Sequence, residues 1–452
     1  MSISTLSRYD PTLLQPHHGH AVVIGASMAG MLAGRALADR FESVTIIDRD
    51  ELPDDPIARR GVPQARQPHV LLEAGRETAE DLLPGLSESL LSEGGLLLDW
   101  TTDLGFFDQG DFLARGPGRI PMFVASRALL EYVTRGLLRE IDAIDFRPGC
   151  RWHDLVVDTS TERVTGITVL DQDGTTEQLD ADLLVDATGR ASRTPRLLRE
   201  HGFPTPRTDE VHIDVMYSSA IVNRPEDDRR MFVLPPSPPL TRGGGAFPLE
   251  DDRWVVTLQG VHGDDPPTEP DGLIEFARSL PIDDIATILT THEWCDDEVI
   301  AHPFPSTMRR RYETLDRFPE RFVVIGDAIA SFNPVYGQGM SVAAMEAVLL
   351  QRVLANGGLE HIGPRFFSQA SDVIDNAWFL AVVADYAFDQ TTGPMPRGAR
   401  MFNRYLSRVI KTAHDDGYVA NRLCEVLMLQ REPTALLRPS ILRRVVTNGL
   451  TT

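Results

Sequence analysis

The sequence predicts an α/β protein with a Rossmann-like domain of three layers, an inserted antiparallel sheet and a helical C-terminal region. Three short apolar runs, at residues 21–24, 183–185 and 322–325, are each followed at once by a turn rich in glycine or aspartate. Buried strands of a parallel sheet have this character, and ligands bind where such strands end. Between the second and third runs, alternating apolar and polar residues indicate half-buried antiparallel strands.

The first apolar run leads into the most specific of the three turns. A strand at residues 21–24 is followed by a glycine-led turn and by a helix that we expect over residues 31–40. The turn matches the dinucleotide fingerprint G-x-G-x-x-G except at its second glycine, which is Ser27 here. A small residue still lets the main chain approach a pyrophosphate closely. The turn consists of Gly25, Ala26, Ser27, Met28, Ala29 and Gly30.

An acidic residue follows the next predicted strand, over residues 43–47. Asp48 stands about 20 residues beyond the glycines, where the fingerprint places a carboxylate that accepts hydrogen bonds from ribose hydroxyls. Arg49 comes directly after Asp48 and is predicted to join the same site. This part of the chain is therefore predicted to bind the adenosine half of a dinucleotide.

The third apolar run ends in Gly326 and Asp327 and precedes a loop and a glycine-led helix. Free N–H groups at such a helix start would face an electron-rich group, and reduced flavin is negative on the pyrimidine side of its ring. Asp327 is predicted to accept a hydrogen bond from a ribityl hydroxyl. An ordinary strand-turn-helix unit with a glycine at its N-terminus is the alternative. The residues predicted to surround the flavin ring are Pro334, Gly337, Gln338, Gly339 and Met340.

The middle run, at residues 183–185, is predicted to be a further strand of the same sheet. It ends in Asp186, and Gly189 closes the turn that follows. Taken alone, this segment is more typical of a plain type I or II turn that closes a hairpin, and its place among the three motifs favours the strand of the sheet.

The three motifs in this order resemble the FAD-dependent monooxygenases of the aromatic hydroxylase type, which have the para-hydroxybenzoate hydroxylase fold. The resemblance covers roughly residues 21–354. It implies that the first motif binds the ADP half of FAD, that Asp186 and Gly189 lie near the pyrophosphate and the nicotinamide path, and that Asp327 holds the ribityl chain. Arg127, in the segment SRALLEYV, matches an arginine that in this family contacts the ribityl-phosphate region.

A narrower resemblance is to the epoxidases and decalin cyclases of polyketide pathways. The segment RRGVPQAR, which contains Arg60 as a predicted cofactor ligand, and the segment NPVYGQGMS carry it. It implies a hydroxylase or epoxidase that uses NAD(P)H and O2, through a flavin 4a-hydroperoxide, on a medium-sized apolar alkene or aromatic substrate. Two alternatives remain open: a non-redox cyclase that uses FAD as a scaffold, and a flavin-binding regulatory protein without turnover.

Composition narrows the class of protein further. A net charge of -22 and a pI near 4.9 argue against a nucleic-acid partner. No apolar run approaches a membrane span and no secretory signal is recognised, so we expect a cytoplasmic protein that does not enter the membrane. The three widely spaced cysteines indicate neither a metal site nor a disulfide framework. No side-chain catalyst is recognised, so the chemistry is assigned to the flavin; the sequence leaves the oligomeric state open.

The positions of the motifs imply a discontinuous FAD domain. We expect this domain to comprise residues 18–73, 120–206 and 304–355, with a substrate-binding region at residues 74–119 and 207–303 and a helical region at residues 356–452. Alternation predicts four strands of the substrate sheet, at residues 211–222, 231–234, 243–249 and 253–261. From residue 362 onward the pattern is helical, over residues 366–388 and then 397–429.

Overall fold

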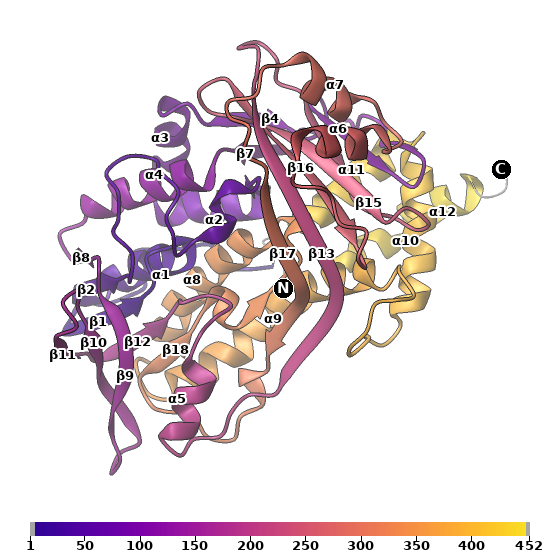
Figure 1. The fold of residues 1–452 in the computed structure, drawn as a ribbon. Helices are drawn as coiled ribbons and strands as arrows, with labels where there is room; N and C mark the ends of the chain where they lie inside the picture. The colour runs from indigo at the N-terminus through magenta and orange to yellow at the C-terminus, as the bar shows by residue number, and fades with distance from the viewer. Residues whose placement is uncertain (1–4, 449–452) are drawn as a thin grey trace.

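The computed structural model describes residues 5–448, so the last four residues of the predicted C-terminal region lie outside it. A five-stranded parallel sheet with the order β18-β12-β1-β2-β8 forms the centre of the first domain (Figure 1). The predicted strands are all present in it. The sheet consists of β1 (His17–Ile24), β2 (Phe41–Ile47), β8 (Ile144–Arg147), β12 (Leu183–Asp186) and β18 (Phe322–Val324).

The three strands that carry the motifs are direct neighbours. β1 pairs with β12, and β12 pairs with β18, all in parallel. Parallel strands end at one edge of a sheet, so the three turns meet at the same edge. The apolar residues that identified these strands are fully buried, among them Val22, Leu184 and Val323.

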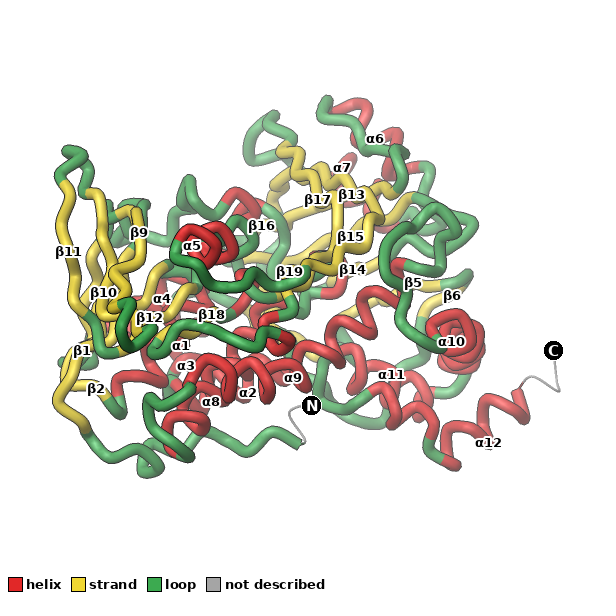
Figure 2. Tube along the Cα trace, turned by 90° about the horizontal axis from the view of Figure 1, so that it is seen from below, coloured by secondary structure: helices red, strands yellow, loops and turns green. Residues whose placement is uncertain are grey.

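Helices cover one face of this sheet and a small antiparallel sheet lies on the other (Figure 2). The prediction of three layers is therefore confirmed. The helical layer contains α1 (Met28–Ala38), α2 (Glu73–Leu82), α3 (Leu86–Ser92), α4 (Arg127–Arg139) and α8 (Gly339–Ala355). The opposite layer contains β9 (Arg151–Asp158), β10 (Arg163–Leu170) and β11 (Thr176–Asp180), with α5 (Thr194–Glu200) beside them.

An eight-stranded sheet with the order β19-β17-β13-β16-β15-β14-β5-β6 forms the second domain. Its four predicted strands are found with slightly different ends, as β13 (Thr208–Asn223), β14 (Met231–Leu234), β15 (Arg242–Leu249) and β16 (Arg253–Val261). Two small helices, α6 (Pro270–Arg278) and α7 (Asp284–Thr291), pack on it. The other strands are β5 (Leu104–Asp108), β6 (Asp111–Phe112), β17 (Ile300–Arg310) and β19 (Ala330–Ser331); β3 (Val70–Leu71), β4 (Leu96–Asp99) and β7 (Pro121–Val124) form a separate small sheet.

Strand β17 runs through the domain boundary that the sequence placed at residue 304. It pairs with β13 along almost its whole length and then with the short β19. β19 follows Asp327 within a few residues, so the eight-stranded sheet is joined directly to the segment that carries the third motif.

The C-terminal region is helical, as predicted: α9 (Ile362–Asp385), α10 (Ala399–Ala413), α11 (Gly417–Leu427) and α12 (Pro439–Asn448). The helical pattern over residues 397–429 corresponds to two helices, α10 and α11. Asp416 ends the continuity because its carboxylate accepts hydrogen bonds from the N–H groups of Tyr418 and Val419, which makes it the N-cap of α11. Within residues 5–448, no helix is both long and apolar enough to cross a membrane.

Candidate cofactor and substrate site

The backbone of the first glycine turn packs directly against the backbone of the middle motif. Gly25 has φ +107°, and a Cβ atom there would lie 2.6 Å from the carbonyl oxygen of Ala187. A Cβ atom on Gly30 would lie 1.7 Å from the carbonyl oxygen of Gly25. Both positions therefore require glycine, because only glycine permits this backbone and this contact. Ser27, Met28 and Ala29 start α1 and line the cavity in front of the turn.

Asp48 lies at the end of β2 and supports the same turn. One carboxylate oxygen accepts a hydrogen bond from the N–H of Ala26 at 2.7 Å, and the other accepts from the N–H of Asp50 at 2.9 Å. Asp48 and Arg49 both line the cavity. Arg60, by contrast, is exposed and lies outside the cavity lining, whereas its neighbour Arg59 is buried and lines it.

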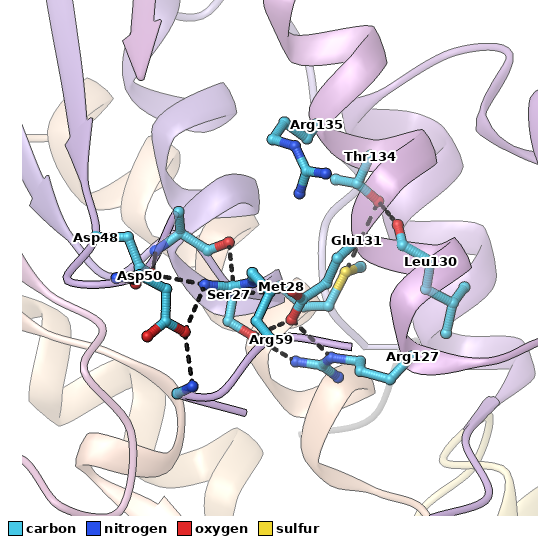
Figure 3. Close-up of polar contacts among 12 residues, drawn as sticks. Ser27, Met28, Asp48, Asp50, Arg59, Arg127, Leu130, Glu131, Thr134 and Arg135 are labelled. Carbon is cyan, nitrogen blue, oxygen red and sulfur yellow. Dashed lines mark hydrogen bonds and ion pairs between the residues drawn. The ribbon is translucent and has the colours of Figure 1, made fainter. Parts of the chain in front are cut away.

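A buried ionic cluster joins the glycine turn to α4 (Figure 3). Nη2 of Arg59 lies 2.8 Å from Oε2 of Glu131, and Nε of Arg127 lies 2.9 Å from Oε1 of the same carboxylate. The hydroxyl of Ser27 donates to Glu131 and accepts from Nη2 of Arg127 at 2.7 Å. Burial alone would raise the pKa of Glu131, but Arg127 and Arg59 lower it, so the carboxylate is ionised.

Glu131 and Arg59 were absent from the site predicted from the sequence. Glu131 occupies an ordinary helix-surface spacing beside Arg127, and Arg59 comes from a loop 72 residues earlier in the chain. No local pattern signals such a pair. Arg127 was predicted from its family motif, and it does line the cavity.

Asp186, in the middle motif, has all its acceptor capacity used within its own turn. One oxygen accepts from the N–H and the hydroxyl of Thr188 at 2.9 and 2.6 Å, and the other accepts from the hydroxyls of Ser192 and Thr194, both at 2.5 Å. Asp186 is fully buried and does not line the cavity. It shapes the turn, and Gly189, with φ +77°, presents its backbone to the cavity instead.

The two residues of the third motif, Gly326 and Asp327, lie in different surroundings. The N–H of Gly326 donates to Oε2 of Glu346 at 2.6 Å, and a Cβ atom on Gly326 would come within 2.8 Å of the Ala29 side chain. Asp327 lines the cavity. Burial raises the pKa of Asp327, while Arg127 and Arg190 act in the opposite direction.

The segment predicted to surround a flavin ring leaves room beside its backbone. Added Cβ atoms on Gly337 and Gly339 would have no neighbour nearer than 3.6 Å and 3.5 Å. Gln338 is 2% exposed, yet its Oε1 atom has no hydrogen-bond partner among the described residues. A buried amide oxygen without a partner costs free energy, so a ligand with a donor group fits there. Pro334 and Met340 line the same space.

A hydrogen-bonded network supports this segment from behind. Oδ1 of Asp385, on α9, accepts from the side-chain amide of Asn333 at 3.0 Å and from the hydroxyl of Tyr336 at 3.1 Å. The hydroxyl of Tyr217 donates to Oδ1 of Asn333 at 3.0 Å. Burial raises the pKa of Asp385 to about 6. Sequence reasoning missed Asp385 because it lies in a helix far beyond the motifs.

One cavity of about 1410 Å³ joins all of these parts. It runs from Gly25 and Asp48, past Asp327 and Gly337, to the eight-stranded sheet and α10. The three turns, the glycine backbone at the start of α8 and the unpartnered Gln338 oxygen fit an elongated dinucleotide with a flavin ring. His69 also lines the cavity, and burial lowers its pKa to about 3, so it is neutral. In the described part of the chain, no group of three or more His, Cys, Asp or Glu side chains is placed to hold a metal ion.

Comparison with known proteins shows the family of this chain. A family model described as an FAD binding domain matches residues 142–361. Protein Rv3254 of Mycobacterium tuberculosis is 31% identical over 421 residues, which is 89% of this chain and 87% of the relative. Kynurenine 3-monooxygenase of Salinispora tropica is 27% identical over 352 residues, covering 74% of this chain and 72% of the relative.

Solved structures show the same fold. PqsL from Pseudomonas aeruginosa, a probable FAD-dependent monooxygenase, superposes with a TM-score of 0.60 at 16% identity over 82% of this chain and 98% of its own. The chain belongs to the family of FAD-dependent monooxygenases of the aromatic hydroxylase type. It is thus a flavoprotein oxidoreductase.

Proposed function

We propose that this protein uses NAD(P)H and O2 to hydroxylate or epoxidise a medium-sized, largely apolar substrate. The observation that carries the proposal is the continuity of the cavity. The same space that begins at the dinucleotide turn reaches past the flavin segment to the inner face of the eight-stranded sheet. A substrate on that sheet would lie against the reactive side of the ring without leaving the protein interior.

The residues assigned to the cofactor each have a distinct task in this proposal. Asp48 would face the adenosine ribose, the N-terminus of α1 at Ser27 would face the pyrophosphate, and Asp327 would face the ribityl chain. The free N–H groups at the start of α8 would stabilise negative charge on the pyrimidine side of the ring. FAD, when bound, supplies the redox chemistry: it accepts a hydride from the nicotinamide and activates oxygen.

The substrate part of the cavity is mainly apolar and partly aromatic. A wall of this kind keeps water from the reacting atoms and holds a flat or unsaturated molecule by burial. The wall is built by strands and loops of the second domain and by the segment after β4. Its apolar members include Trp100, Phe106, Met231, Val233 and Phe247.

The deciding experiment is anaerobic reduction of the FAD-loaded protein. We expect NADPH or NADH to bleach the oxidised flavin band, and a fitting alkene or phenol to accelerate bleaching. Oxygen consumption coupled to a product with one added oxygen atom would then identify the reaction. If neither nucleotide reduces the flavin and the loaded protein still converts a polyene without consuming oxygen, FAD serves as the scaffold of a cyclase.

The regulatory alternative is tested by the same preparation. A protein that binds FAD but turns over no candidate substrate, and whose flavin is not reduced, would be a flavin-binding partner. The family relationship favours an enzyme, because the relatives with named activities are monooxygenases.

A further inference from the structure

The segment over residues 390–414 is positively charged, whereas the protein as a whole is acidic. The chain carries a net charge of -22, yet this segment contains no Asp or Glu. Its basic residues are Arg397, Arg400, Arg404, Arg408 and Lys411. All but Arg397 belong to α10 (Ala399–Ala413), and Arg397 stands just before it.

Four of these basic side chains form one row on α10. At 100° per residue, the positions of Arg400, Arg404, Arg408 and Lys411 fall within an arc of about 80° around the helix, so they share one face. From Arg400 to Lys411 the row is about 16 Å long. All five residues are exposed, and four of them, Arg400, Arg404, Arg408 and Lys411, also line the rim of the large cavity. The other residues of α10 that line the cavity are the polar Asn403 and Ser407 and the apolar Leu406 and Ile410.

None of the five side chains forms an ion pair or a hydrogen bond within the part of the chain that the structure describes. Nearby arginines behave differently: Arg422 and Arg431 both pair with Glu425, and Arg444 pairs with Asp416. Like charges spaced four apart on a helix repel one another. Without a ligand, the repulsion within the row therefore destabilises the protein. Binding of an anion of matching length would relieve this repulsion.

A single carboxylate would neutralise one member of this row and leave the others unpaired. A group with several negative charges suits the length better, and the planar guanidinium matches phosphate oxygens in pairs. We propose that the row on α10 is a binding subsite for a phosphate-bearing group, at the rim of the cavity, on a ligand whose other end reaches inside. The proposal rests on the proposed function in one respect: the cavity is taken to be the site of reaction.

Two ligands could carry such a group. One is the nicotinamide nucleotide, and the other is a substrate with a phosphate-bearing handle. In the second case the reacting part remains apolar, while the whole substrate is amphiphilic.

The test uses FAD-loaded protein and inorganic pyrophosphate as the probe, followed by titration calorimetry at low ionic strength. The variant Arg400→Gln, Arg404→Gln, Arg408→Gln keeps good helix formers on α10 and removes three charges. Its control, Arg199→Gln, Arg438→Gln, Arg443→Gln, removes three charges from exposed arginines that have no ion pair and do not line the cavity. We expect the dissociation constant to rise about tenfold in the α10 variant and to stay within about twofold in the control. Equal weakening in both variants, or in neither, would overturn the proposal.

The two sources are distinguished by flavin reduction without substrate. If the row holds the nicotinamide nucleotide, the α10 variant should show a reduction rate at limiting NADPH about tenfold below that of the control variant. If reduction is unchanged while pyrophosphate binding is lost, the phosphate belongs to the substrate. Pyrophosphate binding requires no redox step, so it decides on the subsite even if the flavin cannot be reduced and the proposed monooxygenase function fails.

Discussion

The hydroxyl group of Ser27 donates a hydrogen bond to the carboxylate of Glu131, 104 residues further along the chain. Ser27 occupies the place of the second glycine in the dinucleotide fingerprint, and this bond gives the departure a physical reason. The serine fastens the start of α1 to α4 (Figure 3). It does so at the point where Arg59 and Arg127 converge on the same carboxylate.

Replacing Glu131 by alanine should destabilise the protein by about 3 kcal/mol, because two buried guanidinium groups lose the carboxylate that they share, although Arg59 keeps its ion pairs with Asp48 and Asp50. Urea unfolding of the apoprotein would measure the effect. Glu200, which forms an exposed pair with Arg196, provides the control, and Glu200→Ala should cost less than about 1 kcal/mol. Equal costs for the two variants would contradict the structural role assigned to the cluster.

Replacing Asp327 by alanine should weaken FAD binding by one to two orders of magnitude, about 1.5 to 3 kcal/mol, because a charge-assisted hydrogen bond is lost. The stability of the apoprotein should change little, since burying the ionised Asp327 carboxylate is itself unfavourable and offsets its attraction to Arg127 and Arg190. Fluorescence titration of the apoprotein with FAD measures the affinity. Asp316→Ala, at an exposed position, is the control; an affinity equal to that of the control would show that Asp327 does not hold the cofactor.

Replacing Gly339 by alanine should separate folding from cofactor binding. An added Cβ atom has room in the apoprotein, where its nearest neighbour would be Oδ1 of Asp327 at 3.5 Å. The atom nevertheless occupies space in front of the α8 N-terminus, where we place the flavin ring. We expect unchanged unfolding of the apoprotein and at least about tenfold weaker FAD binding. Gly136→Ala, in the exposed part of α4 with no neighbour within 4 Å, should stabilise the helix and leave FAD binding intact.

The sequence predicted the parts of the molecule whose signal is local. The four predicted strands of the parallel sheet, the dinucleotide turn and the helix after Gly339 each follow from a few consecutive residues. β17 was not assigned as a strand because its residues IAHPFPSTMRR include two prolines and alternate poorly. Pairing with β13 stabilises this strand, although its local sequence does not favour one.

Side-chain partners distant in sequence were beyond the reach of local patterns. Nothing in the spacing of residues connects Arg59 with Glu131, or Asp385 with Asn333 and Tyr336. The preference for Arg60 over Arg59 shows the same limit: both arginines fit the local segment, and only the fold determines which is buried. The basic residues of α10 could be read from the sequence, but their place at the cavity rim could not.

Glu346 should make the stability of the protein decrease as pH rises through the neutral range. The side chain is fully buried on α8, and burial raises its pKa to about 8, although the N–H of Gly326 acts in the opposite direction. The negative charge of Asp327 raises this pKa further, and Arg309 lowers it. At pH 7 the folded protein therefore holds a proton that the unfolded chain has released.

The sign follows from proton binding. Between the unfolded pKa of 4.5 and the folded pKa of about 8, the folded state binds more protons, so the free energy of unfolding falls as pH rises. Asp385 acts in the same direction, but only up to about pH 6. The contribution of Glu346 to the loss between pH 6 and pH 8 amounts to about 2 kcal/mol at 1.36 kcal/mol per pKa unit. His69, whose pKa is lowered by burial, acts in the opposite direction between about pH 3 and pH 6.5.

Urea unfolding of the apoprotein at pH 4, 5, 6, 7 and 8 would measure this loss and the part of the profile below pH 6. Glutamine resembles the protonated acid and releases no proton on unfolding, so Glu346→Gln should abolish most of the decrease between pH 6 and pH 8. Asp385→Asn is the matched control: it should flatten the profile below pH 6 and leave the decrease above pH 6 in place. A Glu346→Gln profile parallel to that of the wild type between pH 6 and pH 8 would show that Glu346 is already ionised in the folded protein.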